Sequence, residues 1–223
     1  GLRKSAERYL QAIAFQDQYV IGKFEDTYPE KLLLDLYTGA HPYAPFTIDR
    51  MSDALGMYHT NPKLYYVPKQ SVLGDYNKEF GDGLYMIEEH VSDDHDNLES
   101  FGFTKKIEST YDLMDKLRED EEYSIDQREY VKARLFDILI GDWDRHVDQW
   151  RWAEFEQEDG SKLYKSIPRD RDQDFPKYDG IAVNLLKFGV PDFRPMQDYG
   201  PDIKSVKWLN RDGFTLDKAF INE

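Results

Sequence analysis

The chain contains no cysteine among its 223 residues. Disulfide bonds, thiolate nucleophiles and cysteine-ligated zinc sites are therefore excluded. It also lacks any run of about 18 apolar residues, the minimum for a membrane-spanning helix, so we expect no membrane span. A glycine-rich phosphate loop is absent as well, because the Gly-Asp-Gly triplet at 81–83 does not have the GxGxxG spacing.

Positive charge is scarce. The chain carries 29 Lys and Arg against 44 Asp and Glu, a net charge of −15 with a pI near 4.8. Nucleic-acid grooves and contacts with anionic membranes need a surplus of Lys and Arg, so we expect neither as a partner. The 40% hydrophobic content, with 13 Phe, 16 Tyr and 4 Trp, is enough for a folded core. The length suits one domain with two lobes or two small domains.

Apolar periodicity and turn residues predict an α+β chain. We expect helices over 2–14, 29–39, 47–57, 109–120, 125–140 and 203–209. We expect strands over 63–68 and 84–91 and a β-hairpin formed by 150–156 and 162–168. Residues 41–46 form a loop or the start of a helix, and the rest of the tail from 180 to 223 has no clear pattern. The acidic segment 92–100 is predicted to be a mobile linker and the boundary between two lobes.

Two acidic, aromatic-flanked segments surround the predicted hairpin. Residues 141–152 read GDWDRHVDQWRW and residues 167–175 read IPRDRDQDF. Since antiparallel strands lie about 5 Å apart, the two ends of the hairpin must meet. Asp170, Asp172 and Asp174 should therefore lie beside Asp144 and Gln149. Such a set of carboxylate and amide oxygens suits Mg²⁺ or Mn²⁺ better than zinc.

Simpler interpretations of the aspartates stay open. Asp172 and Asp174 can be solvated loop charges, and the arginines at 145, 169 and 171 can pair with the acids. An EF-hand calcium loop is excluded, because Phe175 stands where glycine is required and Ile181 where glutamate is required. His146 is the only histidine of the cluster. The other histidines (His41, His59, His90 and His95) lack metal-ligand spacing and are predicted to be structural or solvent-facing.

These motifs resemble a known family. ARLFDILIGDWDRHVDQWRW, a hairpin and IPRDRDQDF are similar to the kinase-like domain of large envelope-associated proteins of Bacteroidetes, in which it lies near metallophosphoesterase or outer-membrane-barrel segments. HPYAPF, ALGMYHTNPKLYYVPKQ and LGDYNKEFGDGLYMIEEH look like further blocks of that family. The resemblance covers most of residues 1–180. It implies an atypical protein-kinase-like, two-lobed fold with a truncated N-terminal lobe (1–91) and a mostly helical C-terminal lobe carrying the hairpin (92–223).

The site also resembles that of atypical kinases of the HipA, CotH and secretory-pathway casein-kinase type. By that resemblance Asp144 is the catalytic aspartate, and Arg145 and His146 position its loop. Gln149 stands where those kinases carry a metal-binding Asn or Glu, a departure that weakens the second metal position. CotH-like proteins continue with Asp-x-Asp-x-x-Phe after the hairpin, and 170–175 match this pattern. Asp170 is then the principal metal ligand, and Asp172 assists it.

The nucleotide side follows from the same resemblance. Kinase folds bind adenine through the backbone that joins the lobes, and residues 85–91 are the matching connector, with Glu88, Glu89 and His90 offering backbone groups. Lys4 is the candidate for a phosphate-contacting lysine, and Lys69 is the rival. The acid that pairs with this lysine is not determined by the sequence; it is among Glu30, Asp49 and Asp53.

Three functions compete. The first is a kinase-like phosphotransferase that uses Mg²⁺ (or Mn²⁺) and ATP on an unidentified protein, lipid or glycan acceptor. The second is a catalytically inactive pseudokinase or interaction module. The third is metal-dependent phosphoester hydrolysis, which usually needs a histidine-rich ligand set. The resemblance further implies a location in the cell envelope, periplasmic or at the outer membrane, and flanking domains in a longer parent protein.

Overall fold

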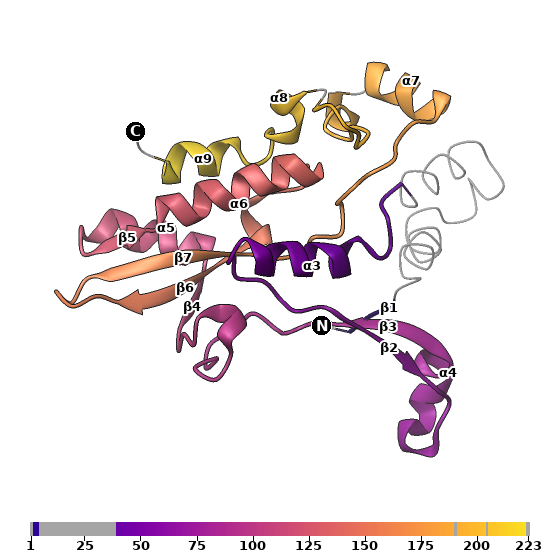
Figure 1. The fold of residues 1–223 in the computed structure, drawn as a ribbon, viewed down its shortest axis with the longest axis horizontal. Coiled ribbons are helices and arrows are strands. Elements are labelled where there is room, and N and C mark those ends of the chain that lie inside the picture. The colour runs from indigo at the N-terminus through magenta and orange to yellow at the C-terminus, as the bar shows by residue number, and fades with distance from the viewer. Residues whose placement is uncertain (1, 5–38, 190, 204, 222–223) are drawn as a thin grey trace.

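The computed structural model describes residues 2–4, 39–189, 191–203 and 205–221, which form a mixed α/β structure (Figure 1). The helices are α3 (Ala44–Ala54), α4 (Asn77–Phe80), α5 (Thr110–Glu119), α6 (Gln127–Ile140), α7 (Ile181–Gly189), α8 (Val206–Leu209) and α9 (Phe214–Phe220). The strands are β1 (Leu2–Lys4), β2 (Lys63–Val67), β3 (Gly83–Ile87), β4 (Ile107–Ser109), β5 (Tyr123–Ile125), β6 (Trp150–Glu156) and β7 (Lys162–Pro168).

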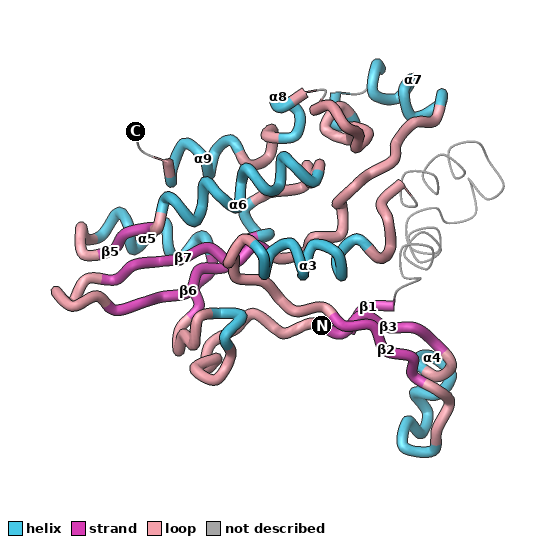
Figure 2. Tube along the Cα trace, in the orientation of Figure 1, coloured by secondary structure: helices cyan, strands magenta, loops and turns pink. Residues whose placement is uncertain are grey.

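The strands form two small sheets, which Figure 2 shows in magenta. The first has the order β1-β3-β2 and is antiparallel throughout. The second has the order β4-β6-β7-β5, in which only β5 runs parallel to its neighbour. The predicted hairpin is confirmed as β6 and β7. Its register pairs Trp150 with Pro168 and Glu156 with Lys162.

Helix α6 is the centre of the larger core. The Asp126 carboxylate caps it by accepting from the Glu129 amide at 3.1 Å, and Gly141 ends it in the left-handed conformation with φ 76°. Tyr130 on this helix packs against Trp150 and Trp152 of β6, with ring centroids 5.1 and 5.7 Å away. Phe220 of α9 closes the cluster edge-on, 4.9 Å from Trp152. The aromatic residues of the sequence therefore join α6, the hairpin and the C-terminal helix.

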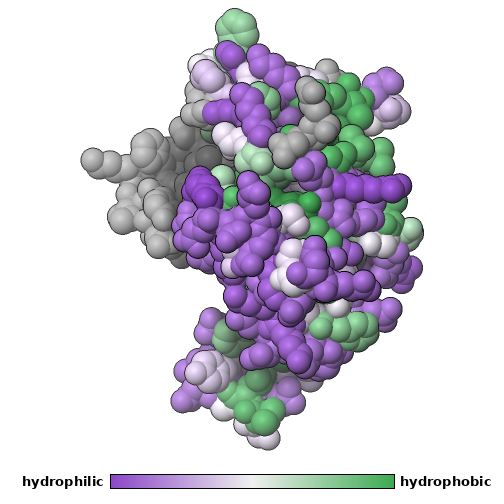
Figure 3. Space-filling model, turned by 90° about the vertical axis from the view of Figure 1, so that its left-hand side faces the viewer, coloured by the Kyte–Doolittle hydropathy of each residue, from purple (hydrophilic) through white to green (hydrophobic). Residues whose placement is uncertain are grey.

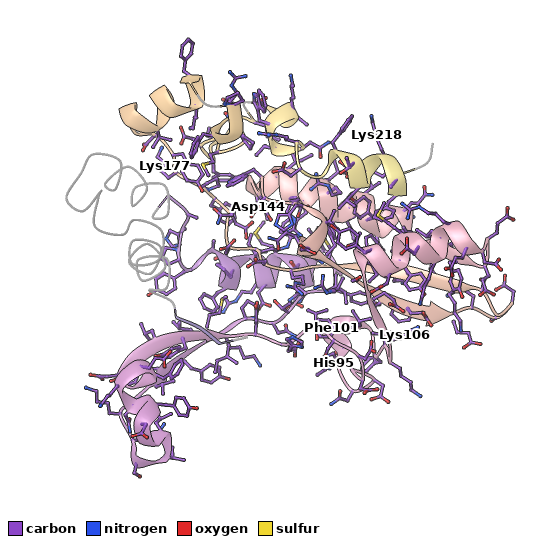
Figure 4. The ribbon with its side chains drawn as sticks, turned by 180° about the vertical axis from the view of Figure 1, so that it is seen from behind. His95, Phe101, Lys106, Asp144, Lys177 and Lys218 are labelled. Atoms are coloured by element: carbon purple, nitrogen blue, oxygen red, sulfur yellow. The ribbon has the colours of Figure 1, made fainter. Side chains whose placement is uncertain are left out.

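The segment 92–100, predicted to be a mobile linker, is tied to the second sheet. Asp93 accepts a hydrogen bond from the Ile107 amide at 2.7 Å. Just beyond the segment, the Phe101 side chain is fully buried against Ala153 and Ile167 of the hairpin. Figure 4 shows His95 beside Phe101, and their ring centroids lie 5.1 Å apart. A buried aromatic residue fixes an otherwise acidic stretch, which the charge pattern alone did not indicate.

Other predictions have mixed outcomes. Helices 109–120 and 125–140 are confirmed as α5 and α6, and 47–57 as α3, which begins earlier than expected. The helix predicted over 2–14 is wrong at its start, because residues 2–4 pair with β3 as a strand. Residues 5–14 lie outside the described residues, and so does the helix predicted over 29–39, except for Gly39. The strand predicted over 84–91 ends at Ile87.

The tail contains more structure than its sequence pattern indicated. A helix predicted near 203–209 is present as α8, but α7 and α9 were not predicted. In the part of the chain that the structure describes, no helix has the length and apolar character needed to cross a bilayer. The face shown in Figure 3 is mainly hydrophilic, as expected for the net charge.

Candidate functional site

The two aspartate segments meet at the open end of the hairpin. Gly141 ends α6 and starts the loop 142–149, while 169–175 follows β7. The Arg169 amide donates to the Gln149 carbonyl at 3.0 Å, which joins the two loops directly. Farther along, the Phe175 amide donates to the Ile140 carbonyl at 2.9 Å. The second loop is thus held at its start against the first loop and at its end against the last residue of α6.

Four predicted site residues form one chain of contacts. The Gln149 amide nitrogen lies 3.3 Å from Asp170 Oδ2 and 3.3 Å from His146 Nε2. His146 Nε2 lies 3.7 Å from Asp144 Oδ1. Asp144 is labelled in Figure 4, in the middle of that view and above α3. The structure therefore brings Asp144, His146, Gln149 and Asp170 together, as the hairpin argument requires.

The charges at this site oppose one another. Burial raises the pKa of the Asp144 carboxyl; His146 and Arg145 lower it, and the Asp212 and Asp170 carboxylates raise it further. Asp170 itself has a left-handed backbone with φ 55°, which few residues other than glycine adopt. Asp is one of the few non-glycine residues enriched in this region, and here it holds a carboxylate close enough to raise the pKa of Asp144.

The histidine tautomer indicates how Gln149 is oriented. The Asp148 amide donates to His146 Nδ1 at 3.2 Å, so a neutral ring carries its proton on Nε2. That N–H suits an oxygen of Gln149, whereas the amide nitrogen now faces it. Turning the amide over would satisfy that N–H, but it would replace the amide's hydrogen bond to Asp170 Oδ2 (3.3 Å) by two facing oxygens, which only a cation between them would stabilise.

Arg145 lies behind the site and is completely buried. Its guanidinium donates to the carbonyls of Arg169 and Gln149 at 2.9 and 3.2 Å. It also lies over the Trp150 ring, 4.8 Å from the centroid. Arg145 therefore holds the two loops together through their backbones.

A buried cluster of charges surrounds Arg145. Burial raises the pKa of Asp142 well above its ordinary value, and burial raises that of Asp174 to about 7 in spite of Arg171 and Arg145 nearby. Neither oxygen of Asp174 has a hydrogen-bond partner among the described residues. The interpretation of Asp174 as a solvated loop charge is therefore wrong. The cations that compensate carboxylates at the end of α6 are guanidinium groups.

A small pocket, open to solvent, lies between α3 and the second loop. Asp170 and Asp172 line one wall, and Glu88 lines another. The α3 wall carries Ser52, which is fully buried and whose hydroxyl has no hydrogen-bond partner among the described residues. The structure therefore places the two predicted metal ligands at a concave surface.

His59 also lines this pocket. It is 6% exposed, and its two ring nitrogens lie 2.8 Å from Asp49 and 2.9 Å from Asp53. Asp49 has a pKa raised by burial, against the lowering effect of His59. The sequence argument had taken His59 for a structural or solvent-facing residue. The i, i+3, i+4 spacing of Asp49, Ser52 and Asp53 was the available signal, because it places all three on one helix face.

The residues predicted to contact the nucleotide do not gather at this pocket, apart from Glu88. The Glu89 amide donates to the Thr60 carbonyl at 2.8 Å, and the His90 carbonyl lies 2.6 Å from His95 Nε2, so these two backbone groups are already engaged. Lys4 stands on β1 opposite Tyr85. The rival Lys69 is exposed beside Gly81, away from the residues that line the pocket.

The carboxylate oxygens of this site are compatible with a hard cation that takes only one or two of its ligands from the protein. Among the described residues, no group of three or more His, Asp or Glu side chains lies close enough to enclose a metal ion. Mg²⁺, however, is commonly held by one or two carboxylates with waters and phosphates completing the shell. The mutually repelling carboxylates of Asp144 and Asp170 fit that arrangement.

Comparison of the chain with protein-family models, curated proteins and solved structures gave no match. Functional arguments for this protein therefore rest on its own residues and geometry.

Proposed function

We propose that this chain is an atypical kinase-like phosphotransferase domain that binds ATP with Mg²⁺ or Mn²⁺. The observation that carries the proposal is the contact chain from Asp144 through His146 and Gln149 to Asp170. It joins a candidate proton acceptor to a candidate cation ligand across two loops that are far apart in sequence. Phosphoryl transfer depends mainly on such placement and on charge neutralisation.

Each residue has a distinct role in this proposal. Asp144 accepts or orients the proton of the acceptor hydroxyl; burial raises its pKa, and His146 opposes that effect. Asp170, with Asp172 and the turned-over Gln149 amide, holds the cation. When bound, the cation would neutralise the phosphate oxygens of the nucleotide. Arg145 keeps the two loops in contact, and the pocket beside α3 receives the nucleotide.

The two-lobed kinase-like arrangement is part of the same proposal. The β1-β3-β2 sheet and α3 would belong to the nucleotide lobe, with the boundary near residues 91 and 92, and α5, α6 and the hairpin to the other lobe. Glu88 at the end of β3 and Asp170 line one pocket, which supports a cleft between the two parts. A parent protein of the cell envelope with further domains, and an acceptor that is a protein, lipid or glycan, complete the proposal.

One observation favours a second function, an inactive interaction module. The backbone groups of Glu89 and His90 that would bind adenine are used in internal hydrogen bonds. Their engagement leaves the adenine subsite weaker than in an active kinase. Nucleotide binding separates the two functions.

The test is a thermal-shift and isothermal titration of the chain with Mn²⁺ and ATP. We expect stabilisation that grows with ligand concentration, and about 2.7 kcal/mol at a hundred times the dissociation constant. Asp170→Asn should abolish the cation-dependent shift, and Asp144→Ala should abolish transfer while the fold is kept.

The matched control is Asp148→Asn. This carboxylate lies on the same loop but is exposed and lines no pocket described above. It should bind and react as the unmodified chain does. No shift with Mn²⁺ and ATP in the unmodified chain would contradict the phosphotransferase and favour the interaction module. Turnover that survives Asp144→Ala would contradict the role of Asp144.

A further inference from the structure

Asp137 is a buried carboxylate on α6, three residues before the helix ends, and it is completely inaccessible. Its Oδ2 lies 2.8 Å from Arg134 Nη1 and 3.4 Å from Arg145 Nε. Its Oδ1 lies 2.8 Å from Arg171 Nη2. One carboxylate therefore contacts an arginine from each of the two site loops.

Each of these arginines is also fastened to its surroundings. Arg145 binds the backbone carbonyls of Gln149 and Arg169, which border the site on both loops. In the sequence, Arg171 directly follows Asp170 and precedes Asp172. Its guanidinium lies 5.0 Å from the centre of the Phe136 ring on α6. A shift of Asp137 would therefore be transmitted to both predicted metal-binding loops.

The charge balance makes Asp137 hard to replace. Two buried guanidinium groups repel each other, and an acid between them offsets that repulsion. Among the described residues, Asp142 forms an ion pair with Arg145 alone, at 3.3 Å, and Asp174 forms no hydrogen bond. Within this described cluster, only Asp137 forms ion pairs with arginines of both loops.

We infer that Asp137 is a positioning residue that sets the separation of Asp144 and Asp170 by clamping Arg145 and Arg171 against α6. The inference rests on the proposed function, since it concerns the same cation site. Asp137 touches neither ligand nor reacting atoms. Residues that support metal ligands in this indirect way typically change metal affinity by about 10–100-fold when replaced.

The experiment uses the full chain and two readouts. Mn²⁺ affinity is measured by electron paramagnetic resonance, and amide hydrogen exchange is measured without ligand. Asp137→Asn should weaken Mn²⁺ binding by at least about tenfold. It should speed exchange in 141–149 and 169–175 and leave exchange in 63–87 unchanged.

Arg134→Gln is the matched control. Arg134 is equally buried and shares Asp137, but its other partners are Asp217 and Asn210 near the C-terminal helix. Its loss should lower stability without changing Mn²⁺ affinity more than about twofold, as expected for a residue outside the metal-supporting set. Equal losses of affinity in the two variants would show a general loosening of the fold and overturn the inference. Unchanged affinity in Asp137→Asn would also overturn it.

Two further outcomes are separable. If the unmodified chain binds no Mn²⁺, the proposed function fails, and the exchange data alone test whether Asp137 holds the two loops. Faster exchange of both loops in Asp137→Asn supports the inference, and unchanged exchange overturns it. If Asp137→Asn does not fold, Arg171→Gln replaces it and releases only the second loop. Faster exchange confined to 169–175 with weaker Mn²⁺ binding supports the inference, and no change in either overturns it.

Discussion

The hairpin and the small sheet differ in how they use similar residues. Both β6 and β2 are rich in aromatic and aliphatic side chains. In β6, Trp150 and Trp152 are fully buried, whereas Tyr65 and Tyr66 in β2 are 46% and 57% exposed. The hairpin packs against α5 and α6, while the small sheet extends away from α5 and α6 toward α4 (Figure 1). An apolar strand becomes a core element only when another element covers it.

The two regions also treat charge differently. Near the hairpin, charged groups are buried and must be balanced, as Asp137 is by three arginines. On the small sheet and just after it, the charges of Lys63 and Lys69 lie in solvent, where they cost little. The region with costly buried charges is the one that carries the candidate site, because low polarity strengthens every electrostatic interaction there.

The largest expected effect comes from the hairpin core. Trp152→Ala removes a buried indole that donates to Thr110 Oγ1 at 3.0 Å and packs on Phe220. We expect the free energy of unfolding to fall by about 3–5 kcal/mol. Urea unfolding measures this loss. The control is Tyr111→Ala, because Tyr111 is an aromatic residue on α5 that is 61% exposed. A loss below about 1 kcal/mol for Trp152→Ala would remove the contrast between the regions, because such values are typical of surface sites.

The next effect is a pH dependence from Asp174. Its folded pKa of about 7 lies above the ordinary value of 3.8, so the folded state binds the proton more tightly than the unfolded state. The stability that this group contributes is fully present below pH 3.8 and is lost as the pH rises through 7. Asp174→Asn should therefore gain about 2–4 kcal/mol relative to the unmodified chain between pH 4 and about pH 8.

Unfolding curves of both proteins at matched pH values provide this measurement. The difference between them cancels carboxylates elsewhere in the chain. Asp142 and Asp144 shift in the same direction and remain in both proteins. A difference that does not vary with pH would mean that Asp174 is not buried as an acid.

The smallest effect is expected in the small-sheet region. Val72 lies just after β2 and is 83% exposed. Val72→Ser should change the free energy of unfolding by less than about 0.5 kcal/mol. Chemical unfolding measures this as well. A loss above about 1 kcal/mol would show that this surface is covered in solution, and the comparison of the two regions would then need revision.

Local sequence features predicted the elements that local physics controls. The helices predicted over 109–120 and 125–140 are present as α5 and α6, and their ends are set by the Ser109 cap and by Gly141. Alternation and the 158–161 turn marked the hairpin, and its geometry brought Asp144 near Asp170. These predictions succeeded because caps, turns and strand pairing act over a few residues.

The partners of buried groups could not be predicted in that way. Asp137 stands alone among apolar residues of α6, and its three arginines come from as far as 34 positions along the chain (137 to 171). The strand at 2–4 was mispredicted for the same reason, since its partner β3 lies far along the chain.

By itself, the sequence determined the helix boundaries around the site, the hairpin and the absence of cysteine chemistry. The tertiary structure alone decided which carboxylates are buried, which arginines offset them and which apolar strand is covered. The physical reason is that desolvation and charge pairing depend on distances between residues far apart in the chain, whereas periodicity and capping depend on near neighbours.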